Sequence, residues 1–334
     1  MRSMKFSFGT IPESAEVAVK LSKLAEQLSL DYAWFADQTF YSDVYVMLGL
    51  CAVNTNRIGL GVGVTNPYTR HPAMTARAIA TVDEISGGRT VLGIGAGNRR
   101  ELLAPLGVDL GNAAARCRDT AIIVRSLLSG KTVNFENENF KVKGVKLDFK
   151  PRPDMPVYLA GRGAKILEAA GEVADGAVIG AFASTKSVRY ALDNIKKGLA
   201  KKSRSLEEID IVSWIGIEIT DDRKTALERR KPSVAHIVGG ANIPTLRAIG
   251  LEDGLINKLK EAYMEGGQTK AAKHIPTSLV EEFSIIGTPE ECAERIDLLR
   301  DAGIKHFAAL LGGELEERLG FLKTYAAKII PKIG

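Results

Sequence analysis

The chain has 334 residues, of which 45% are hydrophobic and 25% charged, a composition typical of a folded globular protein. Its 33 glycines and 12 prolines are scattered, which excludes collagen-like, coiled-coil and disordered chains. The net charge of +5 is small and no basic stripe is interleaved with aromatic residues, so we expect no nucleic-acid partner. A mild basic excess does suit an anionic ligand.

The cysteines and the apolar segments indicate where the protein works. Cys51, Cys117 and Cys292 match neither a metal-binding spacing nor a disulfide framework, which is typical of a reducing compartment. The first residues contain no apolar signal core, and no apolar stretch approaches the ~20 residues that a membrane span needs. We therefore expect a cytoplasmic protein without a membrane partner, folded as a single domain over residues 1–334.

Short apolar runs alternate with amphipathic helical segments along the chain. The predicted strands cover residues 5–10, 32–36, 57–64, 89–94, 157–160, 176–179, 209–219 and 306–311. The predicted helices cover residues 13–28, 44–54, 72–85, 113–128, 164–173, 185–200 and 314–330. Strands that alternate with helices form parallel sheets, and eight of them favour a closed (β/α)8 barrel, the TIM-barrel fold. A doubly wound open sheet is the alternative.

Two segments exceed the simple alternation of strand and helix. Residues 131–150 alternate apolar and polar side chains, which predicts an inserted hairpin after the fourth helix. Residues 221–304 are too long for one crossover, so we expect several helices there, forming a cap or an oligomer surface before the last strand. In such a barrel, function gathers at the carboxyl ends of the strands.

The second and third predicted strands end in polar residues. Asp37 and Gln38 follow the second strand, where a carboxylate either contacts a ligand or serves as a helix cap or salt-bridge partner. The third strand ends in Gly63-Val64-Thr65-Asn66. The glycine permits a bulge and the close approach of a ligand, and Thr65 and Asn66 offer hydrogen bonds to a planar polar ring.

Glycines also close the fourth and fifth strands. The fourth ends in Gly93, Gly95 and Gly97, which match neither the dinucleotide nor the P-loop spacing; the residues 98–100 add an asparagine and two arginines. The fifth ends in Ala160-Gly161-Arg162-Gly163 and opens directly into a helix. Backbone N–H groups at a helix N-terminus bind anions, so we favour a phosphate site there over a simple tight turn.

Motifs for other chemistries are missing from the sequence. The four histidines form no metal-ligand spacing, so we expect no metal, and His71 before Pro72 is better explained as a loop or cap residue than as a base. No Gly-x-Ser-x-Gly elbow is present. Strand ends rich in glycine and amide groups but poor in acid–base groups suit a redox cofactor whose own ring reacts.

These segments together resemble the bacterial-luciferase-like superfamily, and most of all its methylenetetrahydromethanopterin reductases, which use the deazaflavin coenzyme F420. The resemblance is carried by residues 36–37, 63–72, 79–89, 93–97 and 283–289. It implies a TIM barrel, coenzyme F420 at the carboxyl face, and hydride transfer to a small-molecule, pterin-like substrate. It also implies a cis peptide bond between Gly63 and Val64, behind the central ring of the cofactor.

The resemblance assigns roles to individual residues. Cofactor contacts are expected from the ends of the third, fourth and fifth strands: Gly63, Val64, Thr65, Asn66, Gly95, Gly97, Ala160, Gly161, Arg162 and Gly163. Polar groups near the reacting carbon are expected at Asp37, Gln38 and Asn98, and Glu13 is a spare carboxylate that could manage a proton.

The chain departs from this family mainly in the substrate half of the pattern. Gly9 stands where the reductases carry Glu, Asn98 where they carry Asp, and Gln38 where His is usual. The loop 310–313 replaces a Ser-Pro-Ile-Gly-Pro sequence. A divergent pterin reductase and a paralogue with another substrate both stay open. So do an FMN-dependent monooxygenase and a non-catalytic barrel, and we expect a homo-oligomer in each case.

Overall fold

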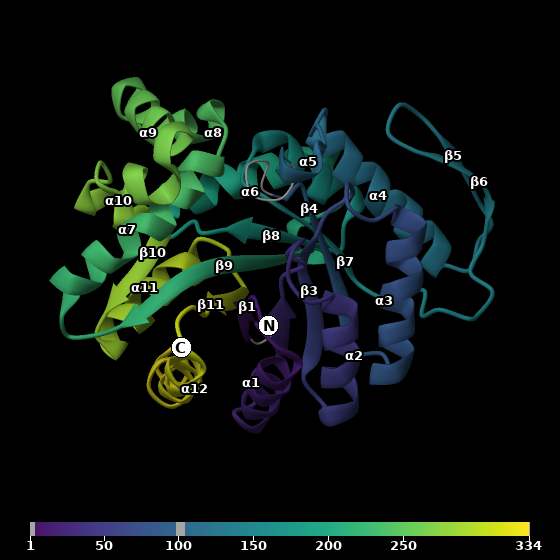
Figure 1. Ribbon diagram of the computed structural model, residues 1–334, viewed down its shortest axis with the longest axis horizontal. Helices are drawn as coiled ribbons and strands as arrows, with labels where there is room; N and C mark the ends of the chain where they lie inside the picture. Colours follow the sequence, from purple (N-terminus) through teal and green to yellow (C-terminus); the bar gives the residue numbers. More distant parts are fainter. Residues whose placement is uncertain (1–3, 98–103, 334) are drawn as a thin grey trace.

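Eight parallel strands close into a barrel in the computed structural model, which describes residues 4–97 and 104–333. The strands are β1 (Lys5–Thr10), β2 (Tyr32–Phe35), β3 (Gly59–Thr65), β4 (Thr90–Gly95), β7 (Val157–Gly161), β8 (Gly176–Gly180), β9 (Asp210–Ile219) and β11 (His306–Leu310). Each pairs with the next, and β11 returns to β1 (Figure 1). This closure confirms the TIM barrel and rules out the open sheet.

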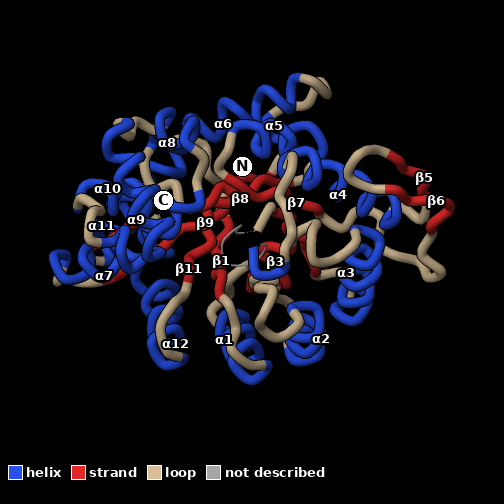
Figure 2. Tube along the Cα trace, turned by 45° about the horizontal axis from the view of Figure 1, so that its top comes forward, coloured by secondary structure: helices blue, strands red, loops and turns tan. Residues whose placement is uncertain are grey.

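Helices surround the strands (Figure 2). They are α1 (Ala15–Gln27), α2 (Val44–Asn54), α3 (Pro72–Ser86), α4 (Ala113–Leu128), α5 (Ala164–Val173), α6 (Thr185–Ala200), α11 (Pro289–Asp301) and α12 (Leu315–Thr324). Several begin at side-chain caps, such as Ser14, Asp43 and Thr288, which satisfy otherwise unpaired N–H groups. His71 caps α3 through Nδ1, in agreement with the sequence interpretation.

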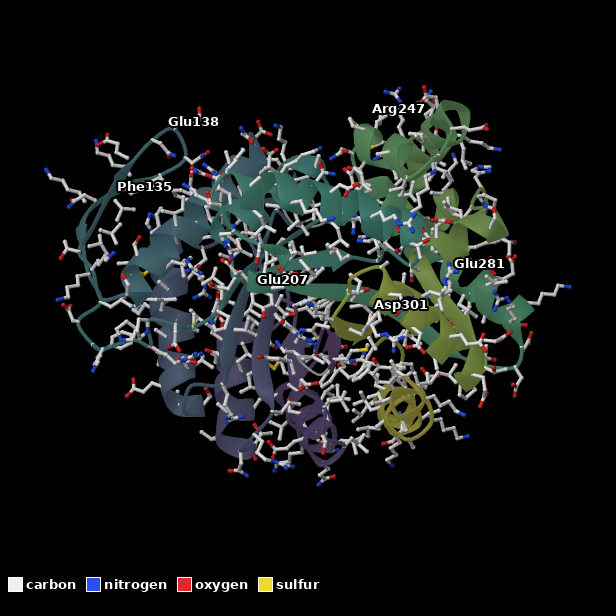
Figure 3. The ribbon with its side chains drawn as sticks, turned by 180° about the vertical axis from the view of Figure 1, so that it is seen from behind. Phe135, Glu138, Glu207, Arg247, Glu281 and Asp301 are labelled. Atoms are coloured by element: carbon white, nitrogen blue, oxygen red, sulfur yellow. The ribbon has the colours of Figure 1, made fainter. Side chains whose placement is uncertain are left out.

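The predicted hairpin is present after α4 and extends away from the barrel (Figure 1). Its strands are β5 (Val133–Glu136) and β6 (Lys141–Val145), which pair antiparallel. Figure 3 shows Phe135 and Glu138 out on this hairpin, at the margin of the molecule. Asn137 and Asn139 both donate to Asp119 on α4, which ties the hairpin to the helical ring.

The long insertion contains helices, as expected, but also one strand. The helices are α7 (Arg223–Gly240), α8 (Ile243–Ala248), α9 (Asp253–Ala272) and α10 (Thr277–Phe283), grouped on the side of the barrel opposite the hairpin (Figure 1). The expected helices are therefore confirmed, and the segment also contains the short strand β10 (Ser284–Gly287), which was not predicted. Because β9 continues past the residues that pair with β11, its last four residues are free to pair with β10.

Large aromatic side chains fill the inside of the barrel, and glycines on neighbouring strands make room for them. A Cβ at Gly59 would overlap the ring of Tyr32, and one at Gly61 would overlap Trp34. Trp34 itself has no exposed surface and packs with Val91, Tyr158, Val178, Val212 and Ala308. These strand glycines are therefore required by packing against the neighbouring strand β2, a contact that a local sequence pattern does not reveal.

A polar cluster closes the amino end of the barrel. Asp210 accepts hydrogen bonds from Lys5 (2.8 Å) and Tyr158 (2.9 Å), and its carboxylate lies 3.3 Å from Nδ1 of His306. His306 Nε2 in turn lies 2.6 Å from the Ser7 hydroxyl. This is the order of a Ser–His–Asp triad, yet Ser7 and His306 have no exposed surface, so no substrate reaches them and the cluster is structural.

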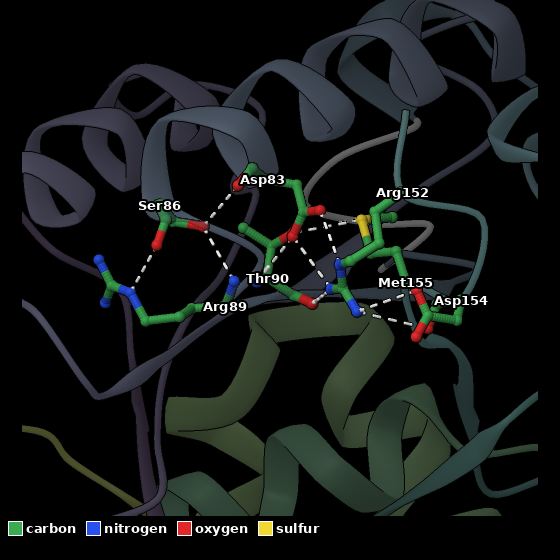
Figure 4. Close-up of polar contacts among 7 residues, drawn as sticks. All are labelled: Asp83, Ser86, Arg89, Thr90, Arg152, Asp154 and Met155. Atoms are coloured by element: carbon green, nitrogen blue, oxygen red, sulfur yellow. Dashed lines mark hydrogen bonds and ion pairs between the residues drawn. The ribbon is translucent and has the colours of Figure 1, made fainter. Parts of the chain in front are cut away.

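The segment 79–89, which contributes to the family resemblance, also lies at this end and is structural (Figure 4). Asp83 accepts from the backbone N–H and hydroxyl of Thr90 and from two nitrogens of Arg152. Arg89 donates to Ser86 and to the last carbonyls of α2. These contacts fasten α2, α3 and the start of β4 to one another.

Candidate functional site at the carboxyl end of the barrel

The end of β3 is irregular. The Gly63–Val64 peptide bond is cis, at the position implied by the resemblance, and the pairing of β3 with β4 shifts register between Val62 and Thr65. The Val64 side chain lies against β4: a Cβ at Gly95 would come within 2.8 Å of its Cγ2. Gly95, expected to contact the cofactor directly, is thus also required for the packing of Val64.

A partly buried carboxylate lies beside this irregular strand end. Asp37 accepts a 2.7 Å hydrogen bond from the hydroxyl of Thr65, which is itself buried. Burial raises the pKa of Asp37, and the hydrogen bond from Thr65 only partly opposes it. A carboxyl group with a raised pKa holds a proton at higher pH than usual, which suits a contact near a reacting centre.

Asn66 has mainly a local role. Its side-chain oxygen accepts from the backbone of Tyr68 and Thr69 and from the Thr69 hydroxyl, which holds the loop after β3 in a tight turn. Tyr68 donates to the carbonyl of Leu110 at 2.7 Å and so connects this loop to the segment before α4. The predicted amide contact between Asn66 and a ligand stays a prediction.

The end of β7 forms an anion-binding arrangement. Gly163 is the N-cap residue of α5 and provides no side-chain cap, so the first N–H groups of that helix lack a side-chain acceptor. Arg162, two residues before α5 begins, extends past Gly180 toward Gly240: a Cβ at Gly180 would lie 3.1 Å from its Nη1. An uncapped helix N-terminus beside a guanidinium is suited to a phosphate.

A second cation lies close to Arg162. Lys260 on α9 donates to the carbonyls of Gly239 and Ala241 at the end of α7. Burial lowers the pKa of Lys260, and the charge of Arg162 lowers it further; burial also lowers the pKa of Arg162. Among the described residues no carboxylate pairs with either cation. An anionic group would compensate both, so the residues present fit the phosphate tail that the resemblance implies.

Glu13 lies at the carboxyl end of the barrel, here called the mouth, but its carboxylate is already paired with an arginine. Arg318 on α12 binds both of its carboxylate oxygens, at 2.7 and 3.0 Å, and also donates to the carbonyl of Gly313. The pair joins the loop after β1 to α12, and the bond to Gly313 adds the loop after β11. Glu13 therefore has a structural role, whereas Asp37 has no cationic partner in direct contact among the residues that the structure describes.

The other predicted residues are less informative. Gln38 is partly exposed after β2, and its backbone carbonyl accepts from Tyr41. Gly97 has a φ of 73°, in the left-handed region that favours glycine. Asn98, Arg99 and Arg100 lie outside the described residues. Among the residues described, no group of three or more His, Cys, Asp or Glu is arranged to hold a metal ion.

Sequence reasoning missed Trp214, which contacts two of the positions it singled out. The indole extends from β9 across the barrel: a Cβ at Gly9 would lie 2.6 Å from its Cζ2, and one at Gly63 would overlap its Cη2. Asp210, Val212 and Trp214 are alternate residues of one predicted strand, so their side chains point to the same side. Strand alternation alone could therefore have placed Trp214 inside the barrel.

Comparisons with known proteins agree with this geometry. The family model described as "Luciferase-like monooxygenase" matches residues 4–306. A 5,10-methylenetetrahydromethanopterin reductase of Archaeoglobus fulgidus is 36% identical over 99% of this chain and 100% of its own length. A second one, of Methanolobus tindarius, is 34% identical over 92% of this chain and 94% of its own length.

The solved structures give the same result. The coenzyme F420-dependent tetrahydromethanopterin reductase of Methanopyrus kandleri superposes with a TM-score of 0.86 at 28% identity, covering 99% of this chain and 100% of the other. Both the fold and the full-length sequence similarity therefore show that the chain belongs to the bacterial luciferase-like family and is related to its 5,10-methylenetetrahydromethanopterin reductases.

Proposed function

We propose that the protein is a coenzyme F420-dependent oxidoreductase that reduces 5,10-methylenetetrahydromethanopterin. The observation that carries the proposal is the full-length similarity, at 36% identity, to a protein named for that reaction. The deazaflavin, when bound, supplies a hydride to the methylene carbon of the substrate. The chain itself contributes binding, orientation and a partly buried carboxyl group.

Each part of the mouth has a task in this proposal. Arg162 and the first turn of α5 hold the phosphate of the cofactor tail, since no carboxylate in the described part of the chain compensates this positive region. Val64 and the adjoining backbone orient the ring. Asp37, with its raised pKa, offers a hydrogen bond near the reacting carbon and can hold a proton there. Lys260 adds a second positive charge near the tail.

The departures bear on the substrate rather than on the cofactor. Gly9 and Gln38 replace polar residues expected from the reductases, and Asn98 lies outside the described residues. The cofactor-binding side keeps Arg162 and the uncapped α5. We therefore propose the pterin as substrate and regard a related electrophilic carbon compound as the alternative.

Cofactor binding tests the proposal directly. Purified protein is titrated with coenzyme F420 and, in parallel, with FMN, following fluorescence and absorbance. Arg162→Ala is expected to weaken F420 binding about ten- to a hundredfold, the loss of a charge-assisted hydrogen bond worth roughly 1.5–3 kcal/mol. Arg247→Ala is the matched control, because Arg247 already pairs with Asp253 and its side chain is 57% exposed at the margin of the molecule (Figure 3).

The outcomes separate the remaining readings. Binding of F420 together with turnover of methylenetetrahydromethanopterin supports the proposal. Tighter binding of FMN would favour a monooxygenase, and binding of neither by a folded protein would favour a non-catalytic barrel. An unchanged dissociation constant for Arg162→Ala would mean that the tail binds elsewhere.

We also propose that the protein is a cytoplasmic homo-oligomer. Its three cysteines are free and buried, consistent with a reducing compartment. The described part of the chain contains no helix that is both long and apolar enough to cross a membrane. Helix α2 is apolar on its outer face as well as its inner one, with Val46, Leu50 and Val53 exposed. Such a face is expected at a contact between subunits.

A further inference from the structure

Trp214 lies at the level where the barrel interior meets the mouth. It is the last inward-facing residue of β9 before that strand leaves the barrel to pair with β10. Its partners in register are Gly180 on β8 and Ala308 on β11, both small. No neighbouring side chain therefore displaces the indole from the centre of the barrel.

The indole spans the barrel and is held in one orientation. Its outer edge fills the space above Gly9 on β1 and Gly63 on β3, where a Cβ would collide with it. From below, Trp34 contacts it edge-to-face, with ring centroids 6.1 Å apart and an interplanar angle of 73°. Trp34 has no exposed surface and so forms a fixed support.

One side of this indole is left open. Trp214 is partly exposed, whereas Trp34 and Val212, the aromatic and aliphatic groups beneath it, are fully buried. Because the groups on the amino side of the indole are buried, we infer that its exposed surface is on the side of the carboxyl end. The residues next to the indole, Gly9, Gly63 and Ala308, are small and uncharged, so the exposed part of Trp214 presents an aromatic group and not a carboxylate.

We propose that Trp214 is the substrate-positioning residue and that the bicyclic ring of the pterin lies against its indole. Flat heteroaromatic rings stack on indole without needing directed hydrogen bonds. This contact would position the substrate ring at a strand level where Gly9 provides no side chain. The inference rests on the proposed pterin reduction and names the residue that selects the substrate.

Kinetics with methylenetetrahydromethanopterin and reduced F420 test the role of the indole. Trp214→Ala is expected to raise the KM for the pterin roughly tenfold, as for the loss of one ring-on-ring contact, whereas Trp214→Phe retains most of the affinity. The dissociation constant for F420 should change less than about threefold in both. Val212→Ala, one inward position deeper on the same strand, is the matched control and should leave KM unchanged.

Fluorescence supplies a readout that needs no turnover, because the chain has only two tryptophans. In Trp34→Phe all indole emission comes from Trp214, and tetrahydromethanopterin without cofactor should protect it from acrylamide quenching. In Trp214→Phe the residual emission comes from the buried Trp34, and the pterin should not alter its quenching. If Trp34→Phe does not fold, as judged by circular dichroism, Trp34→Tyr replaces it.

The results overturn the inference in clear ways. An unchanged pterin KM in Trp214→Ala, or a loss of F420 affinity as large as the loss of pterin affinity, would show that the indole does not position the substrate. Failure of the pterin to protect Trp214 in a protein that binds F420 would refute it as well, and would leave the cofactor assignment intact. Failure of the unmodified protein to bind F420 would instead refute the proposed function.

Discussion

Gly9 has one explanation from the sequence and another from the structure. In the sequence, Gly9 stands where related reductases are expected to carry Glu, so it indicates the loss of a carboxylate. In the structure the same position lies beneath the indole of Trp214, and a Cβ there would come within 2.6 Å of the ring. The absence of a side chain is therefore required by a large residue on β9, and restoring a carboxylate at residue 9 needs a smaller residue at 214.

We predict that Gly9→Ala lowers the free energy of unfolding by about 1–3 kcal/mol, the usual cost of overpacking a filled interior. In a Trp214→Ala background the same substitution should cost much less, because the ring that opposes the new methyl group is gone. Urea denaturation of the four proteins measures this coupling.

The exposed helical Gly320 is the control for this cycle, because a Cβ there meets nothing within 4 Å. Gly320→Ala should be neutral or stabilising by up to about 1 kcal/mol, as for any glycine in a helix. Equal losses from Gly9→Ala with and without Trp214 would show that the cost comes from the backbone instead of from the indole.

At the scale of elements, the amino end of the barrel depends on ion pairs that join helices to strands. Asp83 on α3 is buried and binds Arg152 at 2.8 Å together with Thr90 at the start of β4 (Figure 4). Burial by itself would raise the pKa of Asp83, but the hydrogen bonds from Arg152 and Thr90 outweigh it and lower the pKa. The folded state therefore favours the ionised carboxylate.

We predict that Asp83→Asn destabilises the protein by about 2–3 kcal/mol at neutral pH, as for the loss of hydrogen bonds to a charged group. A lowered pKa stabilises the fold above the unfolded value of about 3.9, and this contribution disappears as the pH falls through the folded pKa. The difference in Tm between Asp83→Asn and the unmodified protein should therefore be largest near pH 7 and shrink toward pH 3.

Asp154 offers a matched control for this measurement. It also lies near Arg152, at 3.7 Å, but is 82% exposed at the surface, where ion pairs contribute little. Asp154→Asn should leave Tm nearly unchanged at both pH values. A difference between Asp83→Asn and the unmodified protein that stayed constant with pH would mean that the carboxylate charge is not the stabilising feature.

The elements themselves were largely predictable, because strand and helix periodicity are local properties. All eight barrel strands and the hairpin were expected within a few residues of their observed bounds. The four-residue strand β10 was missed, since so short an apolar run between helices has no distinctive period. The roles of Gly9 and Gly95 were missed for a different reason: they depend on Trp214 and Val64, which belong to other strands.

The site was predictable to a similar degree and for similar reasons. Asp37 and Thr65 follow adjacent strands, and the structure does bring them within 2.7 Å. Arg162 was expected beside a helix N-terminus and is found there. The contributions of Arg318 and Lys260 were not predicted. Arg318 comes from α12 and Lys260 from the insertion, and the positions of both elements relative to the barrel depend on tertiary packing.

At the scale of the whole molecule, the two ends of the barrel are built differently. The amino end is sealed by Asp210 and its partners, and the hydrogen bonds and charges of Lys5 and His306 lower the pKa of Asp210 despite its burial. The carboxyl end has the partly exposed Trp214, and Arg162, which pairs with no carboxylate among residues 4–97 and 104–333. The buried polar network thus lies at one end, and the residues proposed to bind ligands lie at the other, the arrangement usual in TIM barrels.

The outer face of α2 leads to a prediction about assembly. Val46 and Val53 are 65% and 68% exposed and lie two turns apart with Leu50 between them, so they form one continuous apolar stripe. We predict that Val46→Lys with Val53→Lys converts the protein to a monomer, because two buried charges on each side of a self-complementary contact are strongly unfavourable. Light scattering after size-exclusion chromatography measures the mass.

Met264→Lys is the control for this measurement, because Met264 on α9 is an apolar side chain that is 75% exposed; it should leave the mass unchanged. A monomeric unmodified protein, or an oligomer that survives the double substitution, would show that α2 is not the contact between subunits.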